Sequence, residues 1–149
     1  MLANMFELPS SPSANGRKAS EAIALSGLLD RVACFPGDMF KSSWPERRDA
    51  VLFSNVFHDW DLDTCAALAR SAYAALKPGG SILLHEMLLD EDRSGPLAVA
   101  CCSVTLLLFE RGRQYTAGEL SELLSGAGFT DFRSTPTCAY YSLVQARRP

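Results

Sequence analysis

Residues 50–60 read AVLFSNVFHDW and residues 76–86 read LKPGGSILLHE, and these two stretches decide the fold. In each, a short apolar run ends in a residue with acid–base chemistry, His58 in the first and Glu86 in the second. Apolar runs of this length are typical of strands buried on both faces of a parallel sheet. An open α/β sheet places its chemistry outside the carboxyl ends of its strands. The two stretches therefore predict a base and an acidic partner at the ends of neighbouring strands.

Strand and helix signals alternate on both sides of these stretches. Apolar runs bounded by turn residues predict strands, and apolar residues spaced three to four apart predict helices. We expect strands at 3–8, 32–35, 50–57, 81–89, 129–134 and 139–146, and helices at 17–29, 61–76, 96–109 and 116–127. This alternation predicts an α/β fold with a mainly parallel sheet, and the short link before the last strand predicts an antiparallel finish.

Two of the expected helices carry capping signals. The second helix can be capped by Asp61 or Asp63 and ended by Gly79 or Gly80. Its expected buried face carries Cys65, Leu68, Ala69 and Ala72. Residues 116–119 read TAGE, which is a capping-box pattern and predicts the start of the last helix.

Length, charge and cysteine content exclude several classes of protein. The 149 residues predict a single domain, and a net charge of -3 without a basic stripe argues against nucleic acid as a partner. Five cysteines, an odd number with no Cys-x-x-Cys pair, lie mostly in apolar segments, which is typical of reduced core thiols and predicts a cytoplasmic protein. The apolar stretch 97–109 is too short to span a bilayer, and residues 1–8 lack a signal-peptide pattern, so no membrane partner is expected.

Several short motifs along almost the whole chain resemble a known enzyme family when they are taken together. They are FELP at 6–9, LDRV at 29–32, GDMF at 37–40, HDW at 58–60, LKPGG at 76–80, Glu86, GRQYT at 112–116 and AGF at 127–129. In this order and spacing they resemble the S-adenosylmethionine-dependent small-molecule O-methyltransferases of the caffeic acid and acetylserotonin type, with their bacterial relatives. No single motif is decisive, but the shared register is strong evidence.

The resemblance implies a class I methyltransferase domain with a Rossmann-like sheet, mostly parallel with an antiparallel last strand. Family members also carry an amino-terminal helical dimerisation domain and a glycine-rich motif, both of which would lie before Met1. We therefore expect residues 1–149 to be the later part of a catalytic domain, without the first strand, the glycine-rich loop and the dimerisation domain. Because that first strand is central in the family, we expect the chain to associate with another copy or with a complementary amino-terminal chain.

The resemblance also implies S-adenosylmethionine as cofactor and assigns residues to it. Glu7 matches the acidic residue on the ribose, where the family usually has Asp, and a carboxylate can accept both ribose hydroxyls. Asp38 matches the acceptor for the adenine amino group and Met39 its apolar packing partner, although Gly37 and Asp38 could simply form a turn. Ser54 stands where plant members often have a cofactor-contacting Lys, and it could simply be a strand residue. No metal is expected.

The same comparison implies the catalytic residues. His58 corresponds to the general base, which a hydroxyl acceptor needs because a phenol with a pKa near ten is almost fully protonated at neutral pH. Glu86 corresponds to the carboxylate that orients this base, although adjacent His85 must face the other side of the strand. Gln114 stands where plant members have a second orienting Glu, and its amide can accept a hydrogen bond from imidazole without balancing the charge of imidazolium. Residues 97–109 correspond to the helix that lines the acceptor pocket.

Three functions remain open from the sequence. The first is an O-methyltransferase fragment that acts on a hydroxyl of a small aromatic or polyketide-like acceptor. The second is a non-catalytic remnant that serves as a binding or dimerising module, and the third is a family member with non-methylating chemistry. Cofactor binding separates the first from the second, and methyl transfer separates the first from the third.

Overall fold

The computed structural model describes residues 18, 21–33 and 37–149. The chain divides into two compact units, Met1–Trp44 and Pro45–Pro149. The expected first strand at 3–8, with Glu7, lies outside the described residues, as does Cys34.

In the first unit the expected helix is shorter and the expected strand at 32–35 does not form at its two described residues. The helix includes residues 18 and 21–25 and gives way to a turn at Gly27, which has a φ of 70°. Val32 and Ala33 are not in a strand. The backbone N–H of Val32 donates to the Leu28 carbonyl at 2.8 Å, so a local turn uses the donor that a sheet would need.

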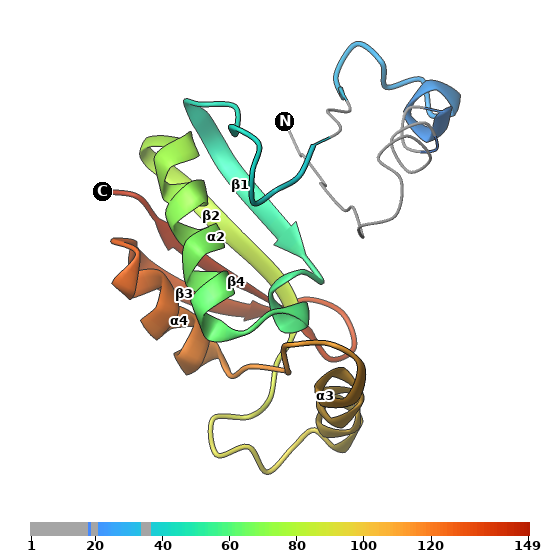
Figure 1. The fold of residues 1–149 in the computed structure, drawn as a ribbon, viewed down its shortest axis with the longest axis vertical. Coiled ribbons are helices and arrows are strands. Elements are labelled where there is room, and N and C mark those ends of the chain that lie inside the picture. Colours follow the sequence, from blue (N-terminus) through green and yellow to red (C-terminus); the bar gives the residue numbers. More distant parts are fainter. Residues whose placement is uncertain (1–17, 19–20, 34–36) are drawn as a thin grey trace. The chain divides into compact units, whose positions relative to one another are not determined.

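The second unit contains a four-stranded mixed sheet (Figure 1). Its strands are β1 (Arg48–Ser54), β2 (Leu76–Met87), β3 (Thr130–Pro136) and β4 (Tyr141–Arg147), in the spatial order β1-β2-β4-β3. β1 and β2 are parallel, and β4 is antiparallel to both β2 and β3. The predicted α/β class and the antiparallel last strand are therefore confirmed. The expectation of a mainly parallel sheet is wrong for the described strands, because β1 and β2 form their one parallel pair and β4 pairs antiparallel on both of its sides.

Four helical elements accompany the sheet: the short 3-10 helix η1 (Phe57–Asp59), α2 (Leu62–Ala75), α3 (Leu97–Phe109) and α4 (Ala117–Gly126). Helices α2 and α4 lie side by side on one face of the sheet, and α3 stands apart at the end toward which β1 points (Figure 1). The predicted buried face of α2 is confirmed, with Cys65, Leu68, Ala69 and Ala72 at 0–1% exposure. Asp61 caps α2 by accepting from Thr64 N at 2.9 Å, and the capping box of α4 is also confirmed.

The expected end of α2 at Gly79 or Gly80 is wrong, because both glycines belong to β2. Leu76 is already extended, with a ψ of 147°, and Pro78 follows two residues later. A proline lacks the N–H that a helix interior needs and disfavours helical geometry in the residue before it. β2 therefore begins at Leu76, five residues before the expected start at 81.

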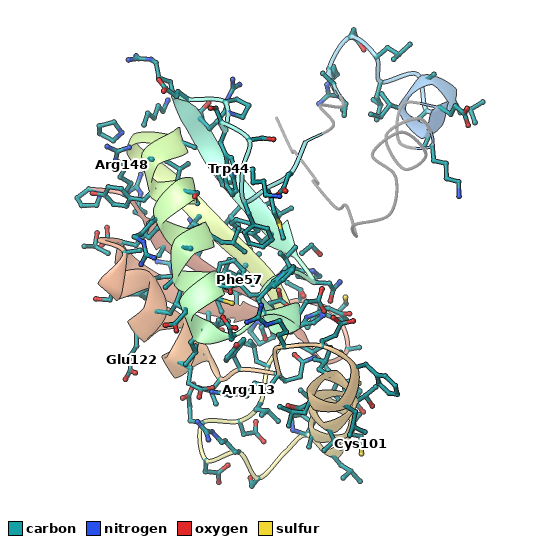
Figure 2. The ribbon with its side chains drawn as sticks, viewed as in Figure 1. Trp44, Phe57, Cys101, Arg113, Glu122 and Arg148 are labelled. Carbon is teal, nitrogen blue, oxygen red and sulfur yellow. The ribbon has the colours of Figure 1, made fainter. Side chains whose placement is uncertain are left out.

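Among the four cysteines that the structure describes, the predicted core position is confirmed for Cys65 alone. Cys101 and Cys138 are exposed, and Figure 2 shows Cys101 on the outer side of α3. Helix α3 has no charged residue, yet it buries only Val99 and Ser103. Its exposed apolar side chains are Leu97, Val104, Leu107, Leu108 and Phe109. Among the helices that the structure describes, none combines the length and the apolar character needed to cross a membrane.

Candidate active site

The turn after β1 places His58 at the carboxyl end of the parallel strands. Asn55 adopts a left-handed φ of 56°, and its N–H donates to the His85 carbonyl at 3.1 Å. Phe57 is fully buried and contacts Phe53 edge to face, with ring centroids 5.0 Å apart. This apolar anchor fixes the position of η1, and with it the backbone of His58.

Glu86 connects β2 to this turn through both of its carboxylate oxygens. Oε1 accepts the backbone N–H groups of Val56 and Phe57, each at 2.9 Å, and Oε2 lies 2.6 Å from Nδ1 of His58. The side chain is 2% exposed. A buried carboxylate is tolerated only when its charge is paired and its lone pairs are used, and all three contacts serve that purpose. The two residues predicted to form the base and its partner are therefore in direct contact.

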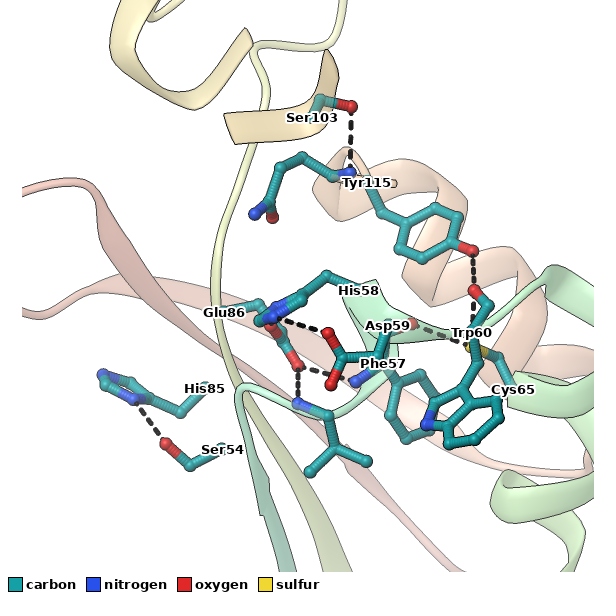
Figure 3. Close-up of polar contacts among 12 residues, drawn as sticks. Ser54, Phe57, His58, Asp59, Trp60, Cys65, His85, Glu86, Ser103 and Tyr115 are labelled. Carbon is teal, nitrogen blue, oxygen red and sulfur yellow. Dashed lines mark hydrogen bonds and ion pairs between the residues drawn. The ribbon is translucent and has the colours of Figure 1, made fainter. Parts of the chain in front are cut away.

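His58 is held between two carboxylates (Figure 3). Nδ1 contacts Glu86, and Nε2 lies 3.2 Å from Oδ1 of Asp59. Burial lowers the pKa of His58, but the hydrogen bonds to Asp59 and Glu86 outweigh it and raise the pKa from 6.5 to about 10. At neutral pH the ring is an imidazolium whose two N–H groups both donate.

Residues 111–116 pack against the backbone of the HDW motif. A Cβ placed on Gly112 would lie 2.1 Å from the His58 carbonyl oxygen and 2.5 Å from the Trp60 nitrogen, so only glycine fits there. The Tyr115 hydroxyl donates to the Trp60 carbonyl at 2.6 Å, and Arg111 N donates to the Asp59 carbonyl at 3.3 Å. These contacts pack the segment against η1 and Trp60.

Gln114 lies within this segment, and its side chain is not a partner of His58. Its backbone N–H donates to the Ser103 hydroxyl of α3 at 3.1 Å. The residue is 1% exposed, and Oε1 is the one buried side-chain polar atom of the described residues that lacks a hydrogen-bond partner. Leaving a buried acceptor unpaired costs about 1–3 kcal/mol. The role of Gln114 in orienting His58 stays a prediction.

Asp38 and Met39 belong to the first unit, where they form a turn. The Asp38 carboxylate accepts Phe40 N at 2.9 Å and lies 3.4 Å from the Lys41 ammonium; these contacts lower the pKa of Asp38, the Phe40 hydrogen bond most strongly. The Met39 carbonyl accepts Nε1 of Trp44 at 3.0 Å. Asp38 thus begins a local turn, and its role in binding adenine stays a prediction. The Asp38 side chain is also exposed, so its carboxylate keeps lone pairs for a ligand.

Ser54 lies at the end of β1, on the face of the sheet opposite to Glu86. Its hydroxyl is 3.2 Å from Nδ1 of His85, whose Nε2 is 3.1 Å from the Thr137 hydroxyl. The His85 ring stacks on Tyr141 at 4.9 Å. Because successive side chains of β2 point to opposite faces of the sheet, His85 and Glu86 lie on different faces, as the sequence indicates.

The sequence alone indicates no function for Asp59, Tyr115 or Cys65. Cys65 donates its thiol to the Phe57 carbonyl at 3.2 Å. The signals available were the HDW and GRQYT motifs, which contain Asp59 and Tyr115 but do not reveal that the two segments touch. Across the described part of the chain, no group of three or more His, Cys, Asp and Glu residues is arranged to hold a metal ion.

Comparison with known proteins identifies the family. A model of the O-methyltransferase domain matches residues 5–130. The chain belongs to the O-methyltransferase family. Acetylserotonin O-methyltransferase of Gallus gallus is 42% identical over 118 residues, which are 79% of this chain and 34% of the relative. The 3-hydroxy-5-methyl-1-naphthoate 3-O-methyltransferase of Streptomyces sahachiroi is 37% identical over 116 residues, 78% of this chain and 34% of that protein.

Solved structures of the O-methyltransferase family share this fold over part of their length. Human N-acetylserotonin methyltransferase, in complex with SAM, matches with a TM-score of 0.74 and 33% identity over 89% of this chain and 44% of that one. An O-methyltransferase family 2 protein of Planctomyces limnophilus, in complex with apigenin, matches with a TM-score of 0.84 and 34% identity over 89% of this chain and 39% of that one. The chain spans about a third of the length of the curated relatives it matches.

Proposed function

We propose that this chain is the later part of an S-adenosylmethionine-dependent O-methyltransferase catalytic domain. In this proposal it methylates a hydroxyl of a small aromatic or polyketide-like acceptor, and His58 is the general base. The observation that carries the proposal is the buried contact between Glu86 and His58 at the carboxyl ends of β1 and β2. Similar proteins support this acceptor class: two are named for methylation of acetylserotonin and of a hydroxynaphthoate, and a third is in complex with apigenin.

The residues proposed to bind the cofactor have side chains that suit the polar groups and the adenine ring of S-adenosylmethionine. Bound S-adenosylmethionine would supply an electrophilic methyl group. Asp38 would accept the adenine amino group with its exposed carboxylate, and Met39 would pack on the ring. Glu7 would accept the ribose hydroxyls, and Ser54 can offer a hydroxyl at the end of β1.

His58 must lose its proton before it can act as a base. With a pKa of about 10, only about 0.1% of the ring is neutral at pH 7. Glu86 contacts Nδ1 of His58, and Asp59 contacts the other ring nitrogen, Nε2. In our proposal an acceptor hydroxyl replaces Asp59 at Nε2, which removes one of the contacts that raise the pKa of His58. Nε2 first releases its own proton to solvent, and the hydroxyl proton then passes to the neutral ring as the acceptor oxygen takes the methyl group.

Methyl transfer to apigenin or N-acetylserotonin tests the proposed function. The wild-type chain is supplied with S-adenosylmethionine, alone and together with a candidate amino-terminal chain, and the methylated product is detected by mass spectrometry. We expect product with wild-type His58 and almost none with His58→Ala. Product formation that is equal in the two proteins would contradict the proposed mechanism, and its absence in every assembly would favour the non-catalytic module.

The Asp59→Asn substitution is expected to lower the pKa of His58 by about 1–3 pH units, because an amide can accept from Nε2 but carries no charge. The chain has two histidines, so an NMR pH titration resolves His58 and uses His85 as an internal control. An unchanged His58 titration, with His85 also unchanged, would show that Asp59 does not set the pKa.

The same substitution should change how stability depends on pH. Because the pKa of His58 in the folded chain, about 10, lies above the ordinary 6.5, the bound proton stabilises the fold. This stabilisation is complete below pH 6.5 and is lost as the pH rises through about 10. We expect the melting temperature of the wild type to fall more across this window than that of Asp59→Asn. Parallel curves for the two proteins would contradict the linkage.

We also propose that the chain associates with another copy or with a complementary amino-terminal chain. The support is α3, where Leu97 and Phe109 are each 79% exposed on a helix without charges. An apolar helix of this kind is normally covered. Sedimentation equilibrium of the isolated chain should give a mass of at least twice 16.2 kDa. A compact monomer with cooperative unfolding would rule out self-association.

A further inference from the structure

Gln114 lies between α3 and the HDW motif. Ser103 of α3 holds its backbone nitrogen, and its neighbours along the chain contact the motif, with Gly112 against the backbone of residues 58–60 and Tyr115 on the Trp60 carbonyl. The segment that contains Gln114 also pairs with the chain that follows β2. Leu89, three residues after Glu86, donates its N–H to the Tyr115 carbonyl at 3.0 Å and forms a parallel bridge with Thr116. The amide of Gln114 is therefore attached to the same rim of the sheet as His58 and Glu86.

The carbonyl oxygen of Gln114 has no hydrogen-bond partner among the residues that the structure describes. Nδ1 and Nε2 of His58 already contact Glu86 and Asp59, and the Ser103 hydroxyl contacts Gln114 through the backbone N–H that it accepts. Each buried polar group of a folded protein normally has a partner, so an orphaned one at a candidate active site suggests a ligand. A carbonyl oxygen only accepts hydrogen bonds, so that ligand must provide an O–H or N–H.

We propose that Oε1 of Gln114 binds a second hydrogen-bond donor of the acceptor, and so selects acceptors that carry an O–H or N–H besides the hydroxyl to be methylated. This inference rests on the proposed function. The methylated hydroxyl cannot serve both purposes, because its one proton goes to Nε2 of His58. A second donor, such as a neighbouring hydroxyl, an amide or a ring N–H, satisfies Gln114 without interfering with that transfer. An acceptor that lacks the donor leaves Oε1 buried and unpaired.

Binding of two matched probes to the full chain tests the proposal without a methyl donor. The probes are 2,3-dihydroxynaphthalene and 2-naphthol, which differ by one hydroxyl, and NMR titration gives their dissociation constants. We expect the wild type to prefer the dihydroxy probe by about 3- to 10-fold, the contribution of one neutral hydrogen bond. Gln114→Met and Gln114→Leu should bring the ratio to about one, while Gln145→Met, a control on β4, should leave it unchanged.

Thermal unfolding separates this role from a structural one. Because Oε1 has no partner to lose, Gln114→Met should melt at or above the wild-type temperature, whereas removal of a structural amide would lower it. The proposal is overturned if the wild type shows no preference or binds neither probe, if the preference survives in both apolar variants, or if both variants are clearly less stable. If the probe-binding ratios are as expected but no methyl transfer occurs, the proposed function is refuted, and Gln114 remains a residue that binds a hydrogen-bond donor.

Discussion

Replacing His58 with Ala or Gln is expected to lower turnover by about 10²- to 10⁴-fold in any assembly of this chain that methylates a phenolic acceptor, the usual loss for a general base. Neither side chain can take the acceptor proton at neutral pH. The affinity for S-adenosylmethionine should stay nearly constant, because the residues proposed to bind it are elsewhere. Steady-state kinetics with a phenolic acceptor, together with calorimetric titration of the cofactor, measure the two quantities.

The chain offers a matched control for this substitution in its other histidine. His85 lies on the opposite face of β2 and contacts Ser54 and Thr137 rather than Glu86. His85→Gln should therefore retain most of the turnover. Unchanged turnover in His58→Ala would show that the base lies elsewhere, and equal losses in both variants would indicate a general effect on folding.

Replacing Glu86 with Ala is expected to reduce the free energy of unfolding by about 3–5 kcal/mol, the loss typical of removing one partner of a buried ion pair. The substitution leaves three donors without their acceptor: Val56 N, Phe57 N and the His58 imidazolium. All three lie in the turn that carries His58, so the site should be lost together with the stability. Urea unfolding followed by circular dichroism gives the free energy.

Two further variants serve as controls for the unfolding of Glu86→Ala. Glu86→Gln keeps an oxygen that can accept the backbone N–H groups but removes the charge, so its loss should be smaller than that of Glu86→Ala. Glu122 is exposed on α4, and Glu122→Ala should change the free energy of unfolding by no more than about 0.5 kcal/mol. A loss for Glu86→Ala as small as that control would mean that the His58 contact does not hold the turn.

The local elements and the pairing of the two catalytic candidates could be predicted because they depend on short-range patterns. The Thr116–Glu119 capping box, the Asp61 cap and the buried stripe of α2 each follow from neighbours within one or two turns. Alternation along β2 put Glu86 on the core face and His85 on the other. Two apolar runs ending in His58 and Glu86 sufficed to predict their contact, because parallel strands end at one edge of a sheet.

Tertiary contacts decided what those patterns leave open. Pro78 and the pairing with β1 extended β2 back to Leu76, where the glycines alone suggested a helix end. The pKa of His58 depends on Asp59 reaching Nε2, which is a matter of side-chain geometry within η1. The hydrogen bonding of Gln114 also depends on tertiary contacts. Its backbone N–H binds Ser103 of α3, a separate segment, and the packing around Oε1 leaves that atom without a partner. Short-range sequence determines which groups face the core, but whether each buried group has a partner is decided only when distant segments pack together.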